Sequence, residues 1–281
     1  MSLAPRMSHF SASDAALEGF QVLRNHWRTL VGWAVFNLLS IAAVVVGFVI
    51  IGVVIVMVAG GDSKTFGEHI GGPVVSFATI AIQFVIGAAV YRLIFRPQDH
   101  GFFYLRFGPD ELRTLVAVLA FLLGLGALAL LAVLLGRAVV PFGVGAPIAV
   151  ALAAIAFGYW LMMRFGLVLP ICVAERRLDF AKSWRLTRSR GWALTGMTLL
   201  AGCLALLLSV LVWGLFFILT LAVVGFRELG NLAGPEGFRD HPGLFLLQAI
   251  APFLLAPFVI TISSAPWADA YKVLSEPPSE D

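Results

Sequence analysis

The stretch Arg164–Trp192 reads RFGLVLPICVAERRLDFAKSWRLTRSRGW and holds the densest run of positive charge in the chain. Long apolar runs lie on both sides of it. A basic segment between two apolar runs is typical of a loop on the cytoplasmic side of a membrane, where Lys and Arg are enriched. We therefore predict that this stretch connects two membrane-spanning helices and fixes the side on which every other loop lies.

The composition of the whole chain agrees with a lipid environment. Of the 281 residues, 60% are hydrophobic and 12% are charged, and the mean hydropathy is +0.96. A soluble domain carries roughly twice this charged fraction, so the polar surface is too small to cover a water-facing globule. In a soluble protein the net charge of +3 would suggest nucleic acid as a partner. Here the bases cluster in loops between apolar runs, so we predict membrane orientation and no nucleic acid.

Hydrophobic segments predict an all-α polytopic membrane protein with six transmembrane helices. Each segment has the ~20 apolar residues needed to cross a ~30 Å hydrocarbon layer. Lipid cannot satisfy an open backbone, so each segment must be helical. The segments are approximately Leu30–Ala59, Pro73–Phe95, Leu112–Leu135, Val139–Met163, Ala193–Phe226 and Leu244–Ala268. The first is about twice the length of a signal-peptide core, so we expect an uncleaved span. The short link 135–138 predicts a tight hairpin between the third and fourth spans.

Three regions are predicted along the chain. Residues 1–29 form a cytoplasmic segment with an amphipathic helix, residues 30–272 the transmembrane domain, and residues 273–281 a disordered acidic tail. The apolar stripe of the amphipathic helix consists of Ala16, Phe20, Leu23, Trp27 and Leu30, at helical spacing. Such a helix either lies in the headgroup plane as an interfacial helix or packs on the inner end of the protein itself.

The distribution of Lys and Arg predicts the orientation. Fifteen of these residues fall on the side that carries both termini and the stretch 164–192, and four fall on the other side. The side with the excess belongs in the cytoplasm. Both termini are then cytoplasmic, which requires an even number of spans and agrees with six.

Few polar residues lie inside the predicted spans, and those singled out as candidates are uncharged. The candidates are Asn37, Gln83, Gln248, Thr261, Ser263 and Ser264. They either line a cavity or form hydrogen bonds between helices.

Three prolines interrupt the sixth segment, at Pro252, Pro257 and Pro266. Broken helices form binding sites in many transporters, whereas kinks that only shape packing are the alternative. No charge lies in the middle of a span, which argues against a proton-coupled pump.

A stripe of small residues follows one face of the third span. Its members are Ala117, Ala120, Gly124 and Ala127. Small residues at this spacing let helices approach closely, so we predict a helix-packing face.

No catalytic, metal or cofactor site is predicted. The chain has no Gly-rich phosphate loop and no nucleophile elbow, and its five His have no metal-ligand spacing. Cys172 and Cys203 form no disulfide framework, and we expect both to be buried thiols. An enzyme is therefore the function class with the least support.

The basic stretch gives the one prediction about partners. Its bases Arg176, Arg177, Lys182, Arg185, Arg188 and Arg190 would lie close to the inner leaflet. Each base there gains about 1 kcal/mol from anionic lipid, and Trp184 and Trp192 are typical interfacial anchors. We predict a membrane module that contacts anionic phospholipid head groups or a partner protein through these residues. In the alternative the charges only set the topology.

A second function class is a small-solute transporter or channel built around the sixth span.

The same stretch carries a family resemblance. Pro170, Glu175, the run Ser183–Arg188 and Trp192 follow the order P…E…SWRLTRG…W. This resembles a stretch in the membrane domain of some bacterial glycerophosphodiester phosphodiesterases and of related six-span inner-membrane proteins of unknown function. Ser189-Arg190 stands where that pattern often has Gly. The resemblance implies a multi-pass protein of a bacterial inner membrane, concerned with lipids or with anchoring a partner. It implies no activity, and no active-site residue is carried over.

A weak internal repeat is also visible. Phe20, Arg24 and Leu30 fall in the same relative places as Trp184, Arg188 and Leu194. Either true repetition or convergence of interfacial residues accounts for this match.

Overall fold

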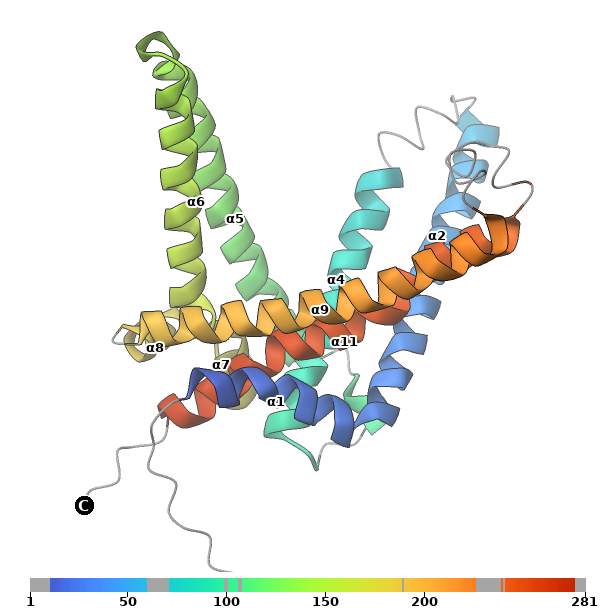
Figure 1. Cartoon of the computed structure of the whole chain (residues 1–281), viewed down its shortest axis with the longest axis horizontal. Coiled ribbons are helices and arrows are strands. Elements are labelled where there is room, and N and C mark those ends of the chain that lie inside the picture. Colours follow the sequence, from blue (N-terminus) through green and yellow to red (C-terminus); the bar gives the residue numbers. More distant parts are fainter. Residues whose placement is uncertain are drawn as a thin grey trace, which may run out of the picture. The chain divides into compact units, whose positions relative to one another are not determined.

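The computed structural model describes residues 11–59, 71–98, 101–105, 108–188, 190–225, 239 and 241–275. Within these ranges the chain is built from helices and contains no strand (Figure 1). Six of the helices described there are long and apolar enough to cross a membrane. The predicted all-α polytopic fold class is confirmed. Most of the predicted tail lies outside the described residues, although the last helix continues to Ser275.

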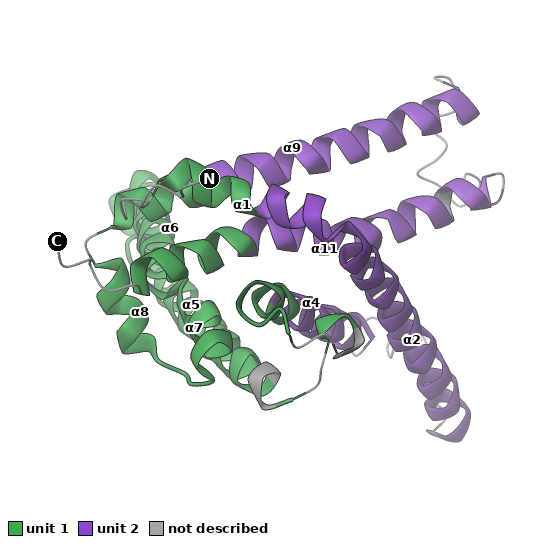
Figure 2. Cartoon of the chain, turned by 90° about the horizontal axis from the view of Figure 1, so that it is seen from below, with its two compact units in different colours: residues 1–18, 88–199, 265–281 green, residues 19–87, 200–264 purple. Residues whose placement is uncertain are grey.

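The chain divides into two compact units, coloured separately in Figure 2. Unit 1 comprises residues 1–18, 88–199 and 265–281, and unit 2 comprises residues 19–87 and 200–264. The boundaries fall inside helices, so several helices contribute to both units.

Unit 2 is made from the membrane-embedded parts of four long helices. They are α2 (Trp27–Ala59), α4 (Gly72–Phe95), α9 (Gly191–Val224) and α11 (Pro242–Ser275). The C-terminal part of α1 (Ala12–Asn25) packs on α11 within this unit. A Cβ at Gly19 would lie 2.7 Å from the Cα of Ile262, so only glycine allows the two backbones to approach so closely.

The buried face of α1 differs from the predicted stripe. It consists of Ala15, Ala16, Gly19 and Val22, all small or medium-sized residues. Phe20 and Trp27 of the predicted stripe are exposed, so these two residues do not pack on the protein. The backbone approach at Gly19 selects a small-residue face, whereas the sequence pattern gave weight to the largest side chains. Because α1 packs through one face and exposes apolar side chains on another, packing on the protein and contact with a membrane surface are compatible.

Unit 1 contains a helical hairpin of α5 (Pro109–Ala138) and α6 (Gly145–Phe165). The connection between them includes the short 3₁₀ helix η3 (Val140–Phe142). The turn therefore follows residue 138 and does not occupy 135–138 as predicted. Proline cannot donate a helical backbone hydrogen bond, and Gly143 adopts φ +99°, a conformation that suits glycine. Together Pro141 and Gly143 end the helix later than the hydropathy pattern indicated.

The packing face between α5 and α6 is also different from the predicted one. Leu125 and Leu128 of α5 lie over Gly158 of α6, with side-chain carbons 3.5 Å from the position of a Cβ there. Three members of the predicted stripe on α5, namely Ala120, Gly124 and Ala127, are exposed, and only Ala117 is buried. The small residue at this contact is on α6, and leucines of α5 cover it.

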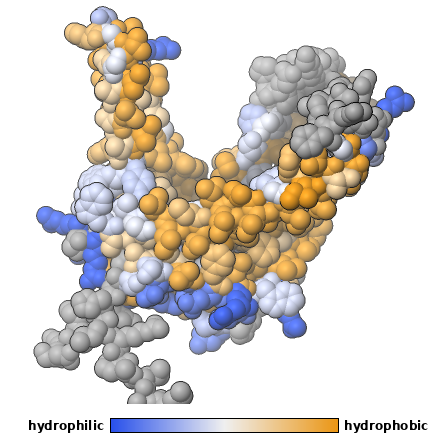
Figure 3. Space-filling model, viewed as in Figure 1, coloured by the Kyte–Doolittle hydropathy of each residue, from blue (hydrophilic) through white to orange (hydrophobic). Residues whose placement is uncertain are grey.

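The remaining elements of unit 1 are short and lie after the hairpin or between α4 and α5. They are the 3₁₀ helix η2 (Gly101–Tyr104), α7 (Val168–Glu175) and α8 (Phe180–Thr187). Large apolar side chains cover the long helices, as the orange surface over the α5–α6 hairpin shows in Figure 3. Leu123 is 74% exposed and Ile155 69% exposed. Soluble monomers rarely expose large contiguous apolar patches. A surface of this kind is therefore expected to lie in hydrocarbon.

Candidate functional site

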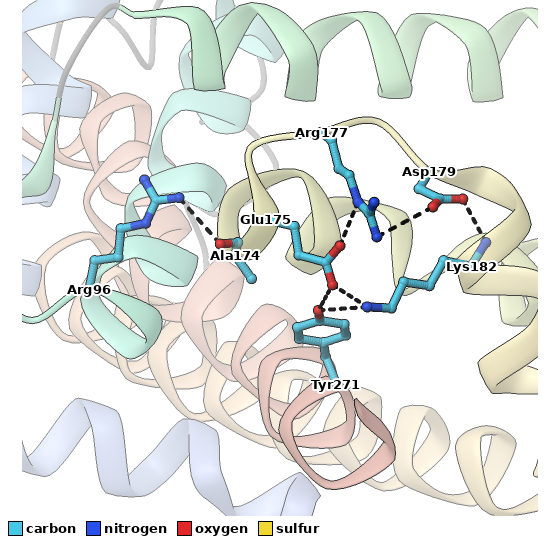
Figure 4. A network of polar contacts seen from close by, with 7 residues as sticks. All are labelled: Arg96, Ala174, Glu175, Arg177, Asp179, Lys182 and Tyr271. Atoms are coloured by element: carbon cyan, nitrogen blue, oxygen red, sulfur yellow. Dashed lines mark hydrogen bonds and ion pairs between the residues drawn. The ribbon is translucent and has the colours of Figure 1, made fainter. Parts of the chain in front are cut away.

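The candidate site is built from the basic segment, defined as residues 176–192, and the helix ends that support it. Before this segment α7 ends because Arg176 turns into the left-handed conformation at φ 55°. The carbonyls in the last turn of a helix have no partner within the helix. Arg96, which follows α4, donates hydrogen bonds from its Nη2 to the carbonyls of Val173 and Ala174 (Figure 4). A cation at this end also favours the helix dipole.

Glu175 is the centre of a polar network that joins three helices of unit 1 (Figure 4). Its Oε1 accepts hydrogen bonds from Lys182 of α8 and from the hydroxyl of Tyr271 near the end of α11. Its Oε2 accepts from Arg177 Nε at 2.7 Å. Hydrogen bonds to an ionised carboxylate are stronger than neutral ones. The network therefore fixes α8 to the end of α7 and to the last turns of α11.

Asp179 begins α8. Its carboxylate accepts a hydrogen bond from the backbone N–H of Lys182 at 2.8 Å, which satisfies one of the unpaired donors of the first turn. Arg177 Nη2 lies 3.8 Å from the same carboxylate. The acidic residues of the segment thus start and position α8.

The Ser-Trp-Arg-Leu-Thr run docks α8 on the end of α6. Ser183 and Thr187 are buried, and their hydroxyls donate to the carbonyl of Arg164 at 2.8 and 3.2 Å. Arg164 in turn donates from Nη1 to the carbonyl of Thr187 at 2.7 Å. Its guanidinium lies 5.5 Å from the centre of the Trp184 ring, within the range of a cation–π contact.

The predicted contact residues therefore separate into two groups. Lys182 and Trp184 belong to the internal contacts that hold α8, and Arg177 pairs with Glu175 although its side chain is 59% exposed. The exposed group consists of Arg176, Arg185, Arg188, Arg190 and Trp192. Trp192 is 91% exposed at the start of α9. Hydrophilic residues gather at the end of unit 1 that carries α8 (Figure 3).

Three residues that stabilise the segment were missed by the sequence reasoning. Arg96 and Arg164 were only part of the count of bases that predicts the orientation, and Tyr271 was not among the candidate residues. An arginine at the end of an apolar run gives the same signal whether it faces water or bonds a backbone carbonyl. No pattern in the sequence distinguishes the two.

A buried arginine supports the link between α4 and α5. Arg92 is 4% exposed and donates to the carbonyl of Tyr104. The hydroxyl of Tyr104 donates to the carbonyl of Pro97 at 3.1 Å, and burial raises the pKa of Tyr104. The phenol therefore stays protonated and available as a donor at any physiological pH.

The predicted intramembrane polar residues differ in burial and in hydrogen bonding. Asn37 of α2 is fully buried, and its Nδ2 donates to the carbonyl of Phe253 on α11 at 2.7 Å, within unit 2. Thr261 is buried and bonds back to the carbonyl of Pro257 in its own helix. Ser263 is exposed and bonds back to the carbonyl of Val259. Gln248 is exposed and Ser264 half-buried.

Of the two alternatives for the prolines of the sixth span, the structure shows no broken helix, because α11 runs as one α-helix from Pro242 to Ser275. A proline in a helix removes the hydrogen bond to the carbonyl four residues earlier. For Pro257 that carbonyl belongs to Phe253, which accepts from Asn37 instead. A neighbouring helix thus supplies the missing donor, one of the ways in which membrane helices tolerate proline.

Two buried acceptors in unit 2 have no hydrogen-bond partner among the described residues. They are Asn37 Oδ1 and Gln83 Oε1. Among all residues that the structure describes, no three His, Cys, Asp or Glu side chains lie together as a metal site would require. Cys172 is buried as expected, whereas Cys203 is exposed on α9.

Comparisons with known proteins do not extend this description. No protein-family model, no curated protein and no solved structure matches the chain. The resemblance to the membrane domain of glycerophosphodiester phosphodiesterases therefore stays a prediction from one loop.

Proposed function

We propose that this chain is an integral membrane module that binds anionic phospholipid head groups through the exposed side of the basic segment. The observation that carries the proposal is the division of its bases. Arg164 and Lys182 are used to hold α8 in place. Arg176, Arg185, Arg188 and Arg190 remain exposed, and among the described residues none of them has an ion-pair partner.

The energetics favour such contacts. A base near an anionic leaflet gains about 1 kcal/mol, and the gain disappears beyond about one Debye length. Trp192 stands beside these bases with its ring uncovered, and tryptophan favours the level of the head groups. The Glu175 network holds α8 in one orientation, so the exposed bases form a fixed surface and need little ordering when lipid binds.

The proposal includes the orientation and location of the protein. We place the basic segment and both termini in the cytoplasm, because the excess of Lys and Arg lies on that side. The family resemblance points to the inner membrane of a bacterium. A small-solute transporter has less support, because the polar side chains of the sixth span differ in exposure and two of their hydroxyls bond to their own helix.

Native mass spectrometry of the full chain from mixed micelles tests the proposal. The micelles contain equal amounts of an anionic and a zwitterionic phospholipid, and the bound lipids of each class are counted. We expect the native chain to retain more anionic lipid, and the triple variant R185Q/R188Q/R190Q to lose most of that preference. Added salt should weaken the preference in the native chain.

The controls are Arg137→Gln and Arg239→Gln, which remove exposed arginines on the other predicted side of the membrane. They should keep the anionic preference. An unchanged preference in the triple variant would overturn the proposal. With that result, the three arginines would only set the topology or would bind an acidic protein partner.

A further inference from the structure

Unit 1 contains an apolar recess that the proposed function does not use. Residues of α5, α6 and α8 line it, including Ala120, Phe121, Gly124, Leu161, Phe165 and Phe180. Its volume is about 200 Å³ and it is open on one side. No lining residue carries a charge or a side-chain hydrogen-bonding group.

We propose that this recess holds one acyl chain of a phospholipid whose head group lies at the basic segment. The inference rests on the proposed function and adds a second point of contact for the same lipid. It changes the expected binding from a diffuse surface contact to a site that takes a single molecule.

The position of the recess favours this occupant. Ala120 and Gly124 lie eight and twelve residues after Leu112, where the span begins, which is about 12 and 18 Å along a helix with 1.5 Å rise per residue. The other end of the recess is formed by Phe180, the first residue of α8. The recess therefore runs from the depth of the hydrocarbon to the segment that carries the exposed arginines.

The aromatic residues fix the end of the recess near the head groups. Phe165 and Phe180 meet edge to face, with ring centres 5.7 Å apart. Both also pack against the small core of Ala117, Val168 and Cys172. This end is thus formed by one aromatic residue of α6 and one of α8 that rest on α7, and the Glu175 network holds α7 and α8 together.

The small residues of α5 explain why the recess exists. Ala120 and Gly124 are both exposed. A Cβ at Gly124 would meet no atom within 4 Å. An unfilled recess would forfeit dispersion contacts with the surrounding hydrocarbon, so a flexible chain fills it favourably. Its volume is below the roughly 300–1,000 Å³ of sites that enclose drug-sized ligands, so it would take part of one acyl chain.

Two glycines on α5 give a matched test. Neither Gly124 nor Gly126 has an atom within 4 Å of a Cβ position, so a side chain can start at both without a clash at Cβ, and leucine changes helix propensity equally at both. Only Gly124 lines the recess. We expect Gly124→Leu to retain about one lipid fewer per chain than Gly126→Leu in the mixed-micelle experiment, with equal thermal stability of the two variants.

A phospholipid with a photoreactive diazirine in its acyl chain gives an independent readout. In the native chain and in Gly126→Leu, the label should attach to peptides that contain Phe121, Leu161 or Phe165. In Gly124→Leu this labelling should fall at least severalfold.

Equal lipid counts and equal labelling in the two leucine variants would overturn the recess as a site. The arginine variants would then decide the proposed function alone. If Gly124→Leu loses both lipid classes equally while the triple arginine variant has no effect, the recess binds a chain and the head-group proposal fails.

Discussion

Asn37 illustrates how a single polar residue stabilises a membrane-embedded helix. Pro257 leaves the carbonyl of Phe253 without its helical donor, and Asn37 on α2 donates to that carbonyl at 2.7 Å. An unsatisfied polar group is costly in hydrocarbon, so the asparagine and the proline are energetically coupled. The pair joins α2 to α11 within unit 2.

This coupling predicts the outcome of a double-mutant cycle. Asn37→Leu should lower the free energy of unfolding by about 0.5–2 kcal/mol, the range of hydrogen bonds between membrane helices. In a Pro257→Ala background the same change should cost clearly less, because alanine at 257 restores the helical donor for the Phe253 carbonyl. Unfolding in detergent, followed by circular dichroism, gives the four free energies. Equal costs in the two backgrounds would mean that the asparagine does not substitute for the missing donor.

Gly19 makes a second prediction at the scale of one residue. Gly19→Ala should destabilise the docking of α1, because the new Cβ would lie 2.7 Å from the Cα of Ile262 and backbone atoms cannot give way cheaply. Gly47→Ala is the matched control, since a Cβ there meets nothing within 4 Å and alanine favours a helix by about 1 kcal/mol. Thermal unfolding should rank the variants with Gly19→Ala below the native chain and Gly47→Ala at or above it. The reverse order would contradict the close approach of α1 and α11.

At the scale of elements, α8 depends on contacts outside its own eight residues. Helices this short are marginal alone, and α8 is held by the Asp179 cap, by the hydroxyls of Ser183 and Thr187, and by the pair of Lys182 with Glu175. The carboxylate of Glu175 also accepts from α11 through Tyr271. Loss of Glu175 therefore affects several helices at once.

Hydrogen exchange measures this dependence. Glu175→Ala should speed the exchange of α8 amides about tenfold or more, since hydrogen bonds to charged groups contribute roughly 1.5–3 kcal/mol each. Arg176→Gln changes the neighbouring residue, which is exposed, and should leave α8 unaffected. Slow exchange of α8 in both variants would show that the network does not hold the helix.

The weak internal repeat predicted from the sequence gains support from burial. The helices α2 and α9 begin at Trp27 and Gly191, each three residues before a fully buried leucine, Leu30 or Leu194. Buried positions then follow at the same steps along both helices. They are Trp33, Asn37 and Ile41 in α2, and Met197, Ala201 and Ala205 in α9.

Much of this architecture was predictable because hydropathy and helix length are properties of single segments. The six spans, the hairpin and the isolation of the basic stretch follow from them. Which face of a helix packs was not predictable. α1 packs through Gly19 and leaves Phe20 exposed, whereas α5 packs through leucines and leaves Gly124 exposed. The side chains of one helix do not reveal what the neighbouring helix presents to them. The roles of Arg164 and Lys182 were likewise inaccessible, since their partners lie on other helices.

At the scale of the whole molecule, lipid solvates the long helices, and the placement of arginine sets the proposed orientation of the chain. The most apolar 18-residue stretch of α9 has no buried residue, so the side chains of that stretch need hydrocarbon around them. The orientation that we propose rests on the basic segment, and the proposed lipid binding requires that segment to face the cytoplasm.

Cysteine labelling of the oriented protein tests this most directly. The variant Arg185→Cys is made in a Cys203→Ser background, because Cys203 is exposed while Cys172 is buried, and Arg137→Cys in the same background is the control. A membrane-impermeant maleimide should label position 137 in intact cells with a permeable outer membrane, and position 185 only in inverted inner-membrane vesicles. Labelling of position 185 from outside the cell would contradict the orientation and with it the proposed role of the basic segment.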